Sequence, residues 1–381
     1  MFKNNGFNIL GAIILILVLL FSLISVSVVQ ASESEASVSA KSAVLYQPDT
    51  KRFVYTKNSK KRLAMASTTK IMTALVAAEN ISSLDEAVVI DGTAAGTEGS
   101  SAYLKCGEVV TAEELLYALL LQSANDAAVA LAVHISGSVE EFATLMNERA
   151  EKMGLSDTHF VNPHGLDADG HYTTAEELAL IASEALKNET VAAIASTYKK
   201  TIVDGERQRT YVNHNKLLYL YDGAVGVKTG FTDNAGRCLV GAAERDGVRL
   251  ISVTLDAPSD WQDHKRLLDL GFEKFSSLKL IDVYELSYEV PLLDGTGECV
   301  RVSNDSELSI VCEGEVGKIE RFVNLPRFIS HTVNKGDVVG RVDFAVEGET
   351  VGSVDLVALE NKEVKKEKDS ILKRIFDKLF S

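Results

Sequence analysis

Residues 66–80 read ASTTKIMTALVAAEN, in which a serine, with a lysine three positions later, opens a run of mostly apolar residues. The pattern predicts a helix over residues 67–80, with Ser67 and Lys70 on one face, a turn apart. A helix start offers unpaired backbone N–H groups that stabilise negative charge. That position suits a nucleophilic serine, provided that the lysine has a lowered pKa and can take its proton. The pair alone is weak evidence, because S-x-x-K matches start at Ser67, Ser196, Ser276 and Ser370.

Two later motifs supply what the pair lacks. Ser123-Ala124-Asn125 lies between two helical segments, where a short turn could present both polar side chains. Lys228-Thr229-Gly230 is predicted to end a strand that begins in GAVGV. A second lysine beside Lys70 would disfavour its charged form by repulsion. Ser123 could pass a proton to a leaving amine, and Gly230 would let substrate backbone lie against the strand edge.

The surrounding pattern predicts the fold. Residues 42–57 read as two strands around a turn, and three strands with a helix over about 261–270 follow residue 223. Between them lies a helical block, within which a Ser or Thr followed by Glu three residues later predicts capping boxes at Thr111, Ser138 and Thr174. We therefore predict an α/β sandwich whose sheet is assembled from both ends of the domain.

The chain changes character after this domain. Short alternating runs separated by Gly-rich turns predict a small all-β domain over residues 282–360. The tail, residues 361–381, carries its apolar residues on one stripe of a helix and Lys and Asp on the rest. We predict a basic amphipathic helix that anchors the protein at a membrane surface. A helix that packs on the β domain, or is frayed, is the alternative.

The N-terminus and the charge restrict the location and the partners. Residues 9–29 are mostly apolar and lead into Val29-Gln30-Ala31, which has the spacing of a signal-peptidase site. We predict an exported protein with a signal peptide over residues 1–31, an uncleaved membrane anchor being the alternative. The chain has 39 Lys+Arg against 54 Asp+Glu, which argues against nucleic acid as a partner.

The chain contains four cysteines, Cys106, Cys238, Cys299 and Cys312. This number is compatible with an oxidising compartment but does not make a disulfide scaffold at this length. Cys299 and Cys312 flank one hairpin region and would be the pair, unless all four are buried thiols.

The three motifs occur in the order typical of the penicillin-recognising serine acyl enzymes. Residues 36–275 resemble the low-molecular-weight penicillin-binding proteins of the D-alanyl-D-alanine carboxypeptidase group. Besides the three motifs, two stretches carry this resemblance: THFVNPHGLDADGHYTTAEELALIA (158–182) and VGVKTGFTDNAGRCLV (225–240). The resemblance implies a serine β-lactamase/transpeptidase fold, in which an antiparallel sheet carries a helical subdomain. It also covers the layout beyond, since the family has a β-rich C-terminal domain and an amphipathic anchoring helix.

The resemblance implies roles by position. Ser67 would be acylated by the penultimate D-alanine carbonyl of a peptidoglycan stem peptide ending in D-Ala-D-Ala, with Lys70 as proton acceptor. Ser123 would relay the proton to the departing D-alanine, and Lys228 would tune both groups. The substrate contacts would come from Asn125 to the amide, Thr229 to the carboxylate, Gly230 along the strand, and the backbone N–H groups of Ser67 and Phe231 to the oxyanion. β-Lactams would be covalent inhibitors, the enzyme would act on the extracytoplasmic face of the cell membrane, and no metal or cofactor would be needed.

The sequence departs from the family at one point. Some members bind the terminal carboxylate with an arginine downstream of K-T-G, where this chain has Asp260 or Trp261. His214 and Arg237 are possible substitutes. His164 and His171 lack the spacing of a metal-ligand frame.

Two rival functions remain open. A class A β-lactamase shares the three motifs, but it needs an E-x-x-L-N loop that does not occur between residues 155 and 190. A non-catalytic, membrane-attached binder of cell-wall peptide would keep the same pocket without turnover.

Overall fold

The computed structural model describes residues 37–293 and 297–364. The predicted signal peptide, residues 1–31, lies outside the described residues. So does nearly all of the predicted anchoring helix, of which only residues 361–364 are described. These four residues contain no helix, and Lys362 forms a β-bridge with Val333.

A five-stranded antiparallel sheet of order β2-β1-β9-β8-β7 forms the frame of the larger domain. Its strands are β1 Ser42–Gln47, β2 Arg52–Lys57, β7 Ala224–Thr232, β8 Gly236–Arg245 and β9 Val248–Leu255. β1 pairs with β9, so the first and last strands of the domain are neighbours. The predicted assembly of the sheet from both ends of the domain, and with it the α/β sandwich, is confirmed.

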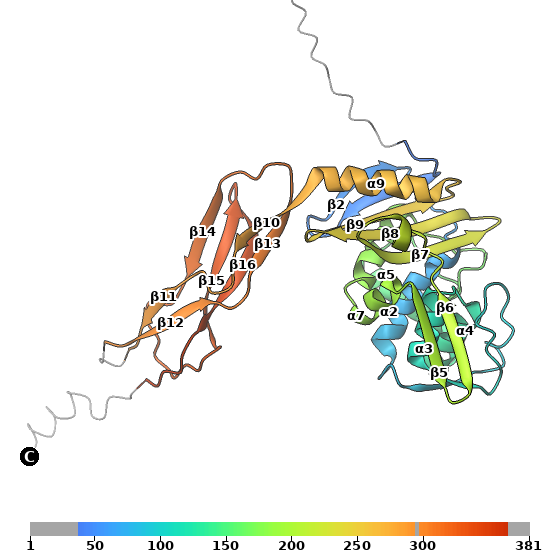
Figure 1. Cartoon of the computed structure of the whole chain (residues 1–381), viewed down its shortest axis with the longest axis horizontal. Helices are drawn as coiled ribbons and strands as arrows, with labels where there is room; N and C mark the ends of the chain where they lie inside the picture. Colours follow the sequence, from blue (N-terminus) through green and yellow to red (C-terminus); the bar gives the residue numbers. More distant parts are fainter. Residues whose placement is uncertain (1–36, 294–296, 365–381) are drawn as a thin grey trace, which may run out of the picture. The chain divides into compact units, whose positions relative to one another are not determined.

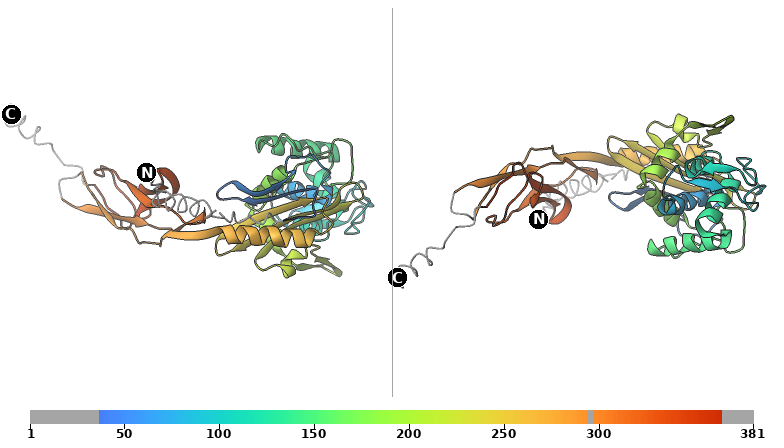
Figure 2. Two further views of the ribbon diagram at one scale, coloured as in Figure 1. Left: turned by 90° about the horizontal axis from the view of Figure 1, so that it is seen from above. Right: turned by 90° about the horizontal axis from the view of Figure 1, so that it is seen from below.

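Helices cover both faces of this sheet (Figure 1). The helix α9, Asp260–Lys274, lies on one face and packs on β9 and β8, and the left view of Figure 2 shows it as an orange helix beside the yellow strands. The helical block packs on the other face and builds the main core between α2 and the sheet. Its members are α2 Lys70–Asn80, α3 Ala112–Leu120, α4 Asn125–Ser136, α5 Val139–Lys152, α6 Ala175–Ala185 and α7 Glu189–Ser196. The short helix α8, Leu217–Leu220, precedes β7.

Two small hairpins complete this domain. They are β3 Ala87–Val89 with β4 Val109–Thr111, and β5 Lys199–Asp204 with β6 Arg207–Val212. Arg207 on the second hairpin pairs with Glu114 of α3 at 3.0 Å, which fixes the hairpin to the helical block.

The predicted capping boxes are half right. Thr111, Ser138 and Thr174 each accept a hydrogen bond from the backbone N–H of the glutamate three residues later. The glutamate side chains were predicted to bond back to the cap, but two of them bind elsewhere. Glu114 accepts from the Tyr211 hydroxyl at 3.0 Å, and Glu177 accepts from the backbone N–H of Asp157 at 2.9 Å. Each of these carboxylates bonds to a donor that is distant in the sequence and therefore does not make the local bond.

The K-T-G motif lies inside β7 and does not end it, which corrects the sequence prediction. β7 continues to Thr232, and the chain turns at residues 233–235, directly before Gly236 opens β8. Gly230 pairs with Cys238, and Phe231 with Arg237. The glycine in Thr229-Gly230-Phe231 suggests the end of a strand in the sequence, but pairing with β8 keeps these residues extended.

The second domain is all β, as predicted. A five-stranded sheet of order β11-β12-β16-β15-β14 packs with a two-stranded sheet, β10-β13, around its own apolar core. The strands are β10 Phe275–Ile281, β11 Tyr288–Pro291, β12 Cys299–Asn304, β13 Leu308–Glu313, β14 Ile319–Asn324, β15 Val338–Val346 and β16 Glu349–Ala358.

All four cysteines are free thiols. Cys299 on β12 and Cys312 on β13 belong to different sheets, so the predicted pair does not form and the alternative of free thiols holds. Only Cys238 is buried, however, and Cys106 is exposed.

Among the described residues, no single helix is long and apolar enough to cross a membrane. The helices α4 and α5 reach that length and composition only when taken together, and they meet at an angle of 84°.

Candidate active site

Ser67 lies in a short 3-10 turn, Ala66–Thr69, that continues directly into α2. Ala66 has a left-handed backbone, with a φ of 48°, and the turn is tied by a bond from the Thr69 hydroxyl to the Ala66 carbonyl at 2.8 Å. A non-glycine residue in this conformation is unfavourable and must be held by its surroundings. The turn therefore presents Ser67 from a rigid support.

Lys70 is fully buried, and its amino nitrogen has three close partners. They are Oγ of Ser67 at 2.9 Å, Oδ1 of Asn125 at 2.6 Å and the carbonyl of His164 at 2.6 Å. The orientation of the Asn125 amide is fixed, because its Nδ2 donates to the carbonyl of Glu98. Two of the three partners are thus obligatory acceptors.

This set of partners can be satisfied by a neutral amine. A neutral amine has two N–H groups, which serve Asn125 and His164, and a lone pair that is left facing the Ser67 hydroxyl. Burial, followed by repulsion from Lys228, holds the pKa of Lys70 well below its ordinary value, although Asp126 opposes the shift. Geometry and electrostatics agree that Lys70 can accept a proton from Ser67.

Lys228 of β7 is the second buried lysine of the site. Its amino group donates to the carbonyl of Thr229 at 2.9 Å. Burial lowers the pKa of Lys228 to about 7. The structure gives it no bond to Lys70 or Ser123, so its influence on Lys70 is electrostatic.

The connection from α3 to α4 carries Ser123 and Asn125. Ser123 has a φ of 61°, a strained conformation that sets the start of α4 two residues later. The buried carboxylate of Asp126 holds a neighbouring segment through bonds from Ser101 Oγ at 2.7 Å and the backbone N–H of Ala102 at 2.9 Å. Asp126 was not predicted as a functional residue, and its place immediately after the S-x-N motif was the available signal.

Gly230 has a packing role that was not predicted, and its contact with substrate stays a prediction. A Cβ at this position would lie 3.0 Å from the backbone nitrogen of Ser67 and 3.1 Å from both the Cβ of Ala66 and the carbonyl oxygen of Met65. Contacts this short are rare for real side chains. The glycine is therefore required so that β7 can pack directly against the turn that carries the nucleophile.

Residues 161–171 form a loop beside the active site, and this loop supports α2 through bonds that the sequence did not predict. The carbonyls of His164 and Pro163 accept from Lys70 at 2.6 Å and from the Thr73 hydroxyl at 2.6 Å. His171 accepts from the backbone N–H of Val161 at Nδ1, so its Nε2 carries the proton and donates to the Thr69 hydroxyl at 2.8 Å. Burial lowers the pKa of His171 to about 4, which keeps this arrangement neutral. Both ring nitrogens of His171 are used to hold the loop.

A cleft of about 390 Å³ opens beside Ser67. Its lining brings together the predicted residues Ser67, Ser123, Thr229, Gly230 and Phe231 and both proposed substitutes, His214 and Arg237. The Phe231 side chain is exposed. Arg237 is held by Asp260 through Nε and Nη2, with a shortest distance of 2.8 Å, and its Nη1 has no partner among the described residues. A free guanidinium edge is thus available at the cleft.

Two known protein families together match most of the chain. The family model described as D-alanyl-D-alanine carboxypeptidase matches residues 29–259, and that of the penicillin-binding protein 5 C-terminal domain matches residues 275–364. The chain is 33% identical to the D-alanyl-D-alanine carboxypeptidase DacF of Bacillus subtilis, over 86% of this chain and 87% of the relative. It is 32% identical to DacC of Escherichia coli, over 86% and 85%.

Solved structures agree with the sequence comparisons. Penicillin-binding protein 5 of Haemophilus influenzae is 28% identical and covers 85% of this chain and 98% of its own, with a TM-score of 0.63. The Streptomyces K15 DD-transpeptidase is 33% identical and covers 62% of this chain and 98% of its own, with a TM-score of 0.59.

Proposed function

The chain belongs to the D-alanyl-D-alanine carboxypeptidase family, and we propose that Ser67 carries its reaction, the removal of the terminal D-alanine from peptidoglycan stem peptides ending in D-Ala-D-Ala. The enzyme is a serine-type carboxypeptidase of this family. The observation that carries the assignment of Ser67 is the position of Lys70, whose amino nitrogen lies 2.9 Å from the Ser67 hydroxyl and has its other two close contacts with acceptors.

Acylation begins with transfer of the Ser67 proton to the neutral amine of Lys70. Ser67 Oγ then attacks the carbonyl of the penultimate D-alanine, and the oxyanion is stabilised by the backbone N–H groups of Ser67 and Phe231. Ser123, which lines the same cleft, delivers a proton to the departing amine as the C–N bond breaks, and it is reprotonated with the proton that Lys70 took from Ser67. Water then hydrolyses the ester, returning the proton to Ser67 and releasing the shortened peptide.

Asn125 has a positioning role in this proposal. Its amide is engaged by Lys70 and Glu98, so it orients the base before substrate arrives. Its contact with the substrate amide stays a prediction from the resemblance.

Arg237 and Thr229 bind the terminal carboxylate in this proposal. Arg237 lies on β8, directly across from Phe231, and lines the cleft with Thr229. Asp260 occupies one edge of the guanidinium and leaves the Nη1 edge for substrate, the bidentate geometry that suits a carboxylate. This arrangement would replace the downstream arginine of some family members.

The location follows from the substrate. Peptidoglycan lies outside the cytoplasmic membrane, so the enzyme acts in the extracytoplasmic space. Attachment to the membrane surface through residues 361–381, and export through residues 1–31, belong to the proposal and rest on the sequence pattern. β-Lactams would acylate Ser67 as covalent inhibitors.

Two assays test this function and separate it from its rivals. The wild type should release D-alanine from a diacetyl-lysyl-D-Ala-D-Ala tripeptide and form a stable adduct with fluorescent penicillin, and Ser67→Ala should do neither. Rapid turnover of penicillin without D-alanine release would indicate a β-lactamase. Penicillin labelling without release of D-alanine would indicate a non-catalytic binder.

A further inference from the structure

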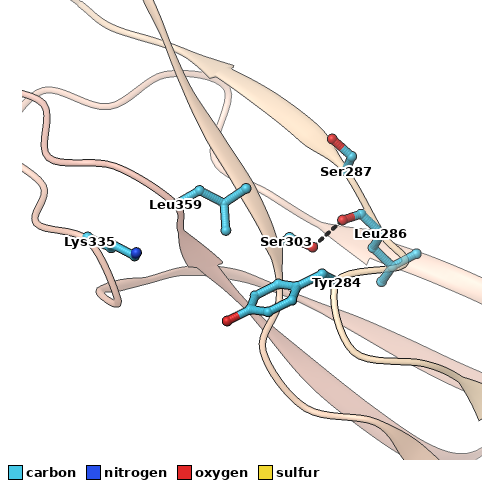
Figure 3. Close-up of a pocket in the computed structure, with 6 residues that line it drawn as sticks. All are labelled: Tyr284, Leu286, Ser287, Ser303, Lys335 and Leu359. Carbon is cyan, nitrogen blue, oxygen red and sulfur yellow. Dashed lines mark hydrogen bonds between the residues drawn. The ribbon is translucent and has the colours of Figure 1, made fainter.

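The β-rich domain contains a pocket that the catalytic account does not use. It has a volume of about 360 Å³ and is lined by Tyr284, Leu286, Ser287, Ser303, Lys335 and Leu359 (Figure 3). These residues come from the segment between β10 and β11, from the end of β12, and from the segments before β15 and after β16. Four separate parts of the chain thus meet at this pocket.

Tyr284 is held in an unfavourable backbone conformation, with a φ of 58°. Asn304, which is fully buried, holds the segment around it. The backbone N–H of Tyr284 donates to the Asn304 carbonyl at 3.0 Å, and the Asn304 side chain accepts from the backbone N–H of Leu286 at 2.9 Å. The Ser303 hydroxyl donates to the Leu286 carbonyl. Strain that a buried polar network maintains at an exposed residue is typical of a binding position.

The tyrosine ring remains in solvent despite this rigid support. Its side chain is 63% exposed. Figure 3 shows the ring of Tyr284, the side chain of Leu359 and the amino group of Lys335 around one space, with the amino group directed toward the ring. A fixed, exposed aromatic ring can bind a flat apolar surface with little loss of entropy, and its hydroxyl can bond to a polar edge.

Lys335 supplies a free positive charge to the pocket. It forms no ion pair among the residues that the structure describes, and the nearby carboxylate of Asp337 accepts from the backbone N–H of Asn334 at 2.8 Å. The backbone of Lys335 is held by Asn361 at 2.7 Å. A lysine without an ion pair beside an exposed ring can attract an anion locally, although the chain as a whole carries a net charge of −15.

We propose that this pocket binds the polysaccharide strand of peptidoglycan. The face of an N-acetylated amino sugar would stack on the Tyr284 ring, and a free carboxylate of the peptide that the sugar carries would pair with Lys335. The choice of this polymer rests on the proposed function, which brings the enzyme to peptidoglycan. Stem peptides are attached to the polysaccharide, so binding of the polysaccharide at the β domain raises their local concentration at the active site. D-alanine release from polymeric substrate should therefore be faster, whereas release from short peptides should not change.

The test compares polymer with short peptide, using the full chain in detergent. Purified sacculi freed of teichoic acid are incubated with Ser67→Ala protein and sedimented, and D-alanine release from sacculi is measured with active protein. Tyr284→Ala and Lys335→Glu should each lower binding to sacculi and release from them about fivefold or more. Release from the diacetyl tripeptide should not change, and Tyr284→Phe should retain binding because the ring remains.

Matched controls are available on the same molecule. Lys318→Glu makes the same charge change in the β domain at a residue paired with Glu320, and Tyr219→Ala removes an exposed ring from the catalytic domain. Both should behave as wild type. The proposal is overturned if the pocket variants, with unchanged melting temperature, bind and process sacculi as the wild type does, or if the controls lose as much.

Two further outcomes are distinct. The first is binding to sacculi that requires teichoic acid. The second is binding of the wild type to lipid vesicles without peptidoglycan, with loss of that binding in the pocket variants. In either case the pocket recognises another partner and the proposal is wrong. Loss of D-alanine release from the tripeptide in every variant, wild type included, would contradict the proposed function, while sedimentation with sacculi would still report on the pocket.

Discussion

The amino nitrogen of Lys70 lies 2.6 Å from Oδ1 of Asn125, a residue 55 positions later in the chain. The carbonyl of His164 takes the second N–H of Lys70, so a neutral amine is satisfied and still has a lone pair for Ser67. The S-x-N motif therefore acts on the S-x-x-K pair directly, before any substrate is present.

Asn125→Asp should raise the pKa of Lys70, because a carboxylate at the same position stabilises the ammonium form. Acylation by fluorescent penicillin near pH 7 should fall about 100-fold or more, since general base catalysis contributes roughly 10²- to 10⁴-fold, and rise again at higher pH. Asn147→Asp, which changes an amide on α5 that bonds Phe160, is the control. An unchanged pH profile in Asn125→Asp would contradict the role given to this contact.

Lys228→Met should change the pH dependence of acylation. The fall in acylation rate on the acid side of the pH–rate profile (the acid limb) should occur at higher pH than in the wild type. Lys228 lowers the pKa of Lys70 by repulsion, after the larger effect of burial, so its removal should raise that pKa. The measurement is the pH at which the acylation rate is half-maximal, between about pH 5 and 9. The maximal rate is not used, because it also depends on how well the ligand binds. Lys216→Met changes an exposed lysine of the same cleft and should leave the limb in place. A shift of the limb to lower pH in Lys228→Met would show that the sign is wrong.

Gly230→Ala should greatly slow acylation with a modest effect on folding. The added Cβ would meet the backbone nitrogen of Ser67 at 3.0 Å and displace the nucleophile turn from β7. Stopped-flow acylation and thermal unfolding are the measurements. Gly317→Ala, where the nearest atom would be 3.7 Å away, is the matched control. If Gly230→Ala acylates at the wild-type rate, close packing of β7 on the turn is not required.

Arg237→Ala should lower kcat/KM for the D-Ala-D-Ala tripeptide by about 10- to 100-fold, mostly through KM, since a charged hydrogen bond contributes roughly 1.5 to 3 kcal/mol. With the same tripeptide carrying a C-terminal amide, the variant and wild type should differ little. The double variant Arg237→Ala with Asp260→Asn checks that an unpaired buried Asp260 is not the cause. Equal losses on acid and amide would exclude Arg237 as the carboxylate ligand.

The buried, neutral His171 should cause the free energy of unfolding to fall as the pH is lowered. Its pKa is about 4 in the folded protein, against an ordinary histidine value of 6.5, so the unfolded chain binds the proton more readily between these values. Stability from this group is complete above pH 6.5 and falls as pH decreases to 4, by up to roughly 3 kcal/mol. His171→Gln should flatten this dependence in chemical denaturation, whereas His331→Gln, at an exposed position, should not. Parallel slopes for wild type and His171→Gln would contradict the account.

The sequence predicted the fold and the members of the site better than it predicted their contacts. Periodicity and cap residues locate helices because they depend on near neighbours, and the three motifs could be read without a structure. The bond between Asn125 and Lys70 could not, since it depends on Glu98 holding the amide from another loop. The packing role of Gly230 could not be read from the sequence for the same reason, because its contact with Met65 and Ser67 exists only after β7 packs on the turn.

The loop of residues 161–171 shows the same limit. Its two histidines attract attention in sequence, but its contact with the base is made by a backbone carbonyl, that of His164. Backbone groups are present at every residue and leave no signal in the sequence. The part of the site that fixes Lys70 from behind was therefore found only in the structure.

The most direct test of the central claim is the protonation state of Lys70 in the resting enzyme. With 13C-labelled lysine and the resonance assigned through Lys70→Met, the Cε shift can be followed by NMR over a range from about pH 5 to 11. We predict that Lys70 titrates well below the ordinary lysine value of 10.5 and is neutral at the pH where acylation is fastest. A Lys70 that remains charged at that pH would contradict its role as the base for Ser67.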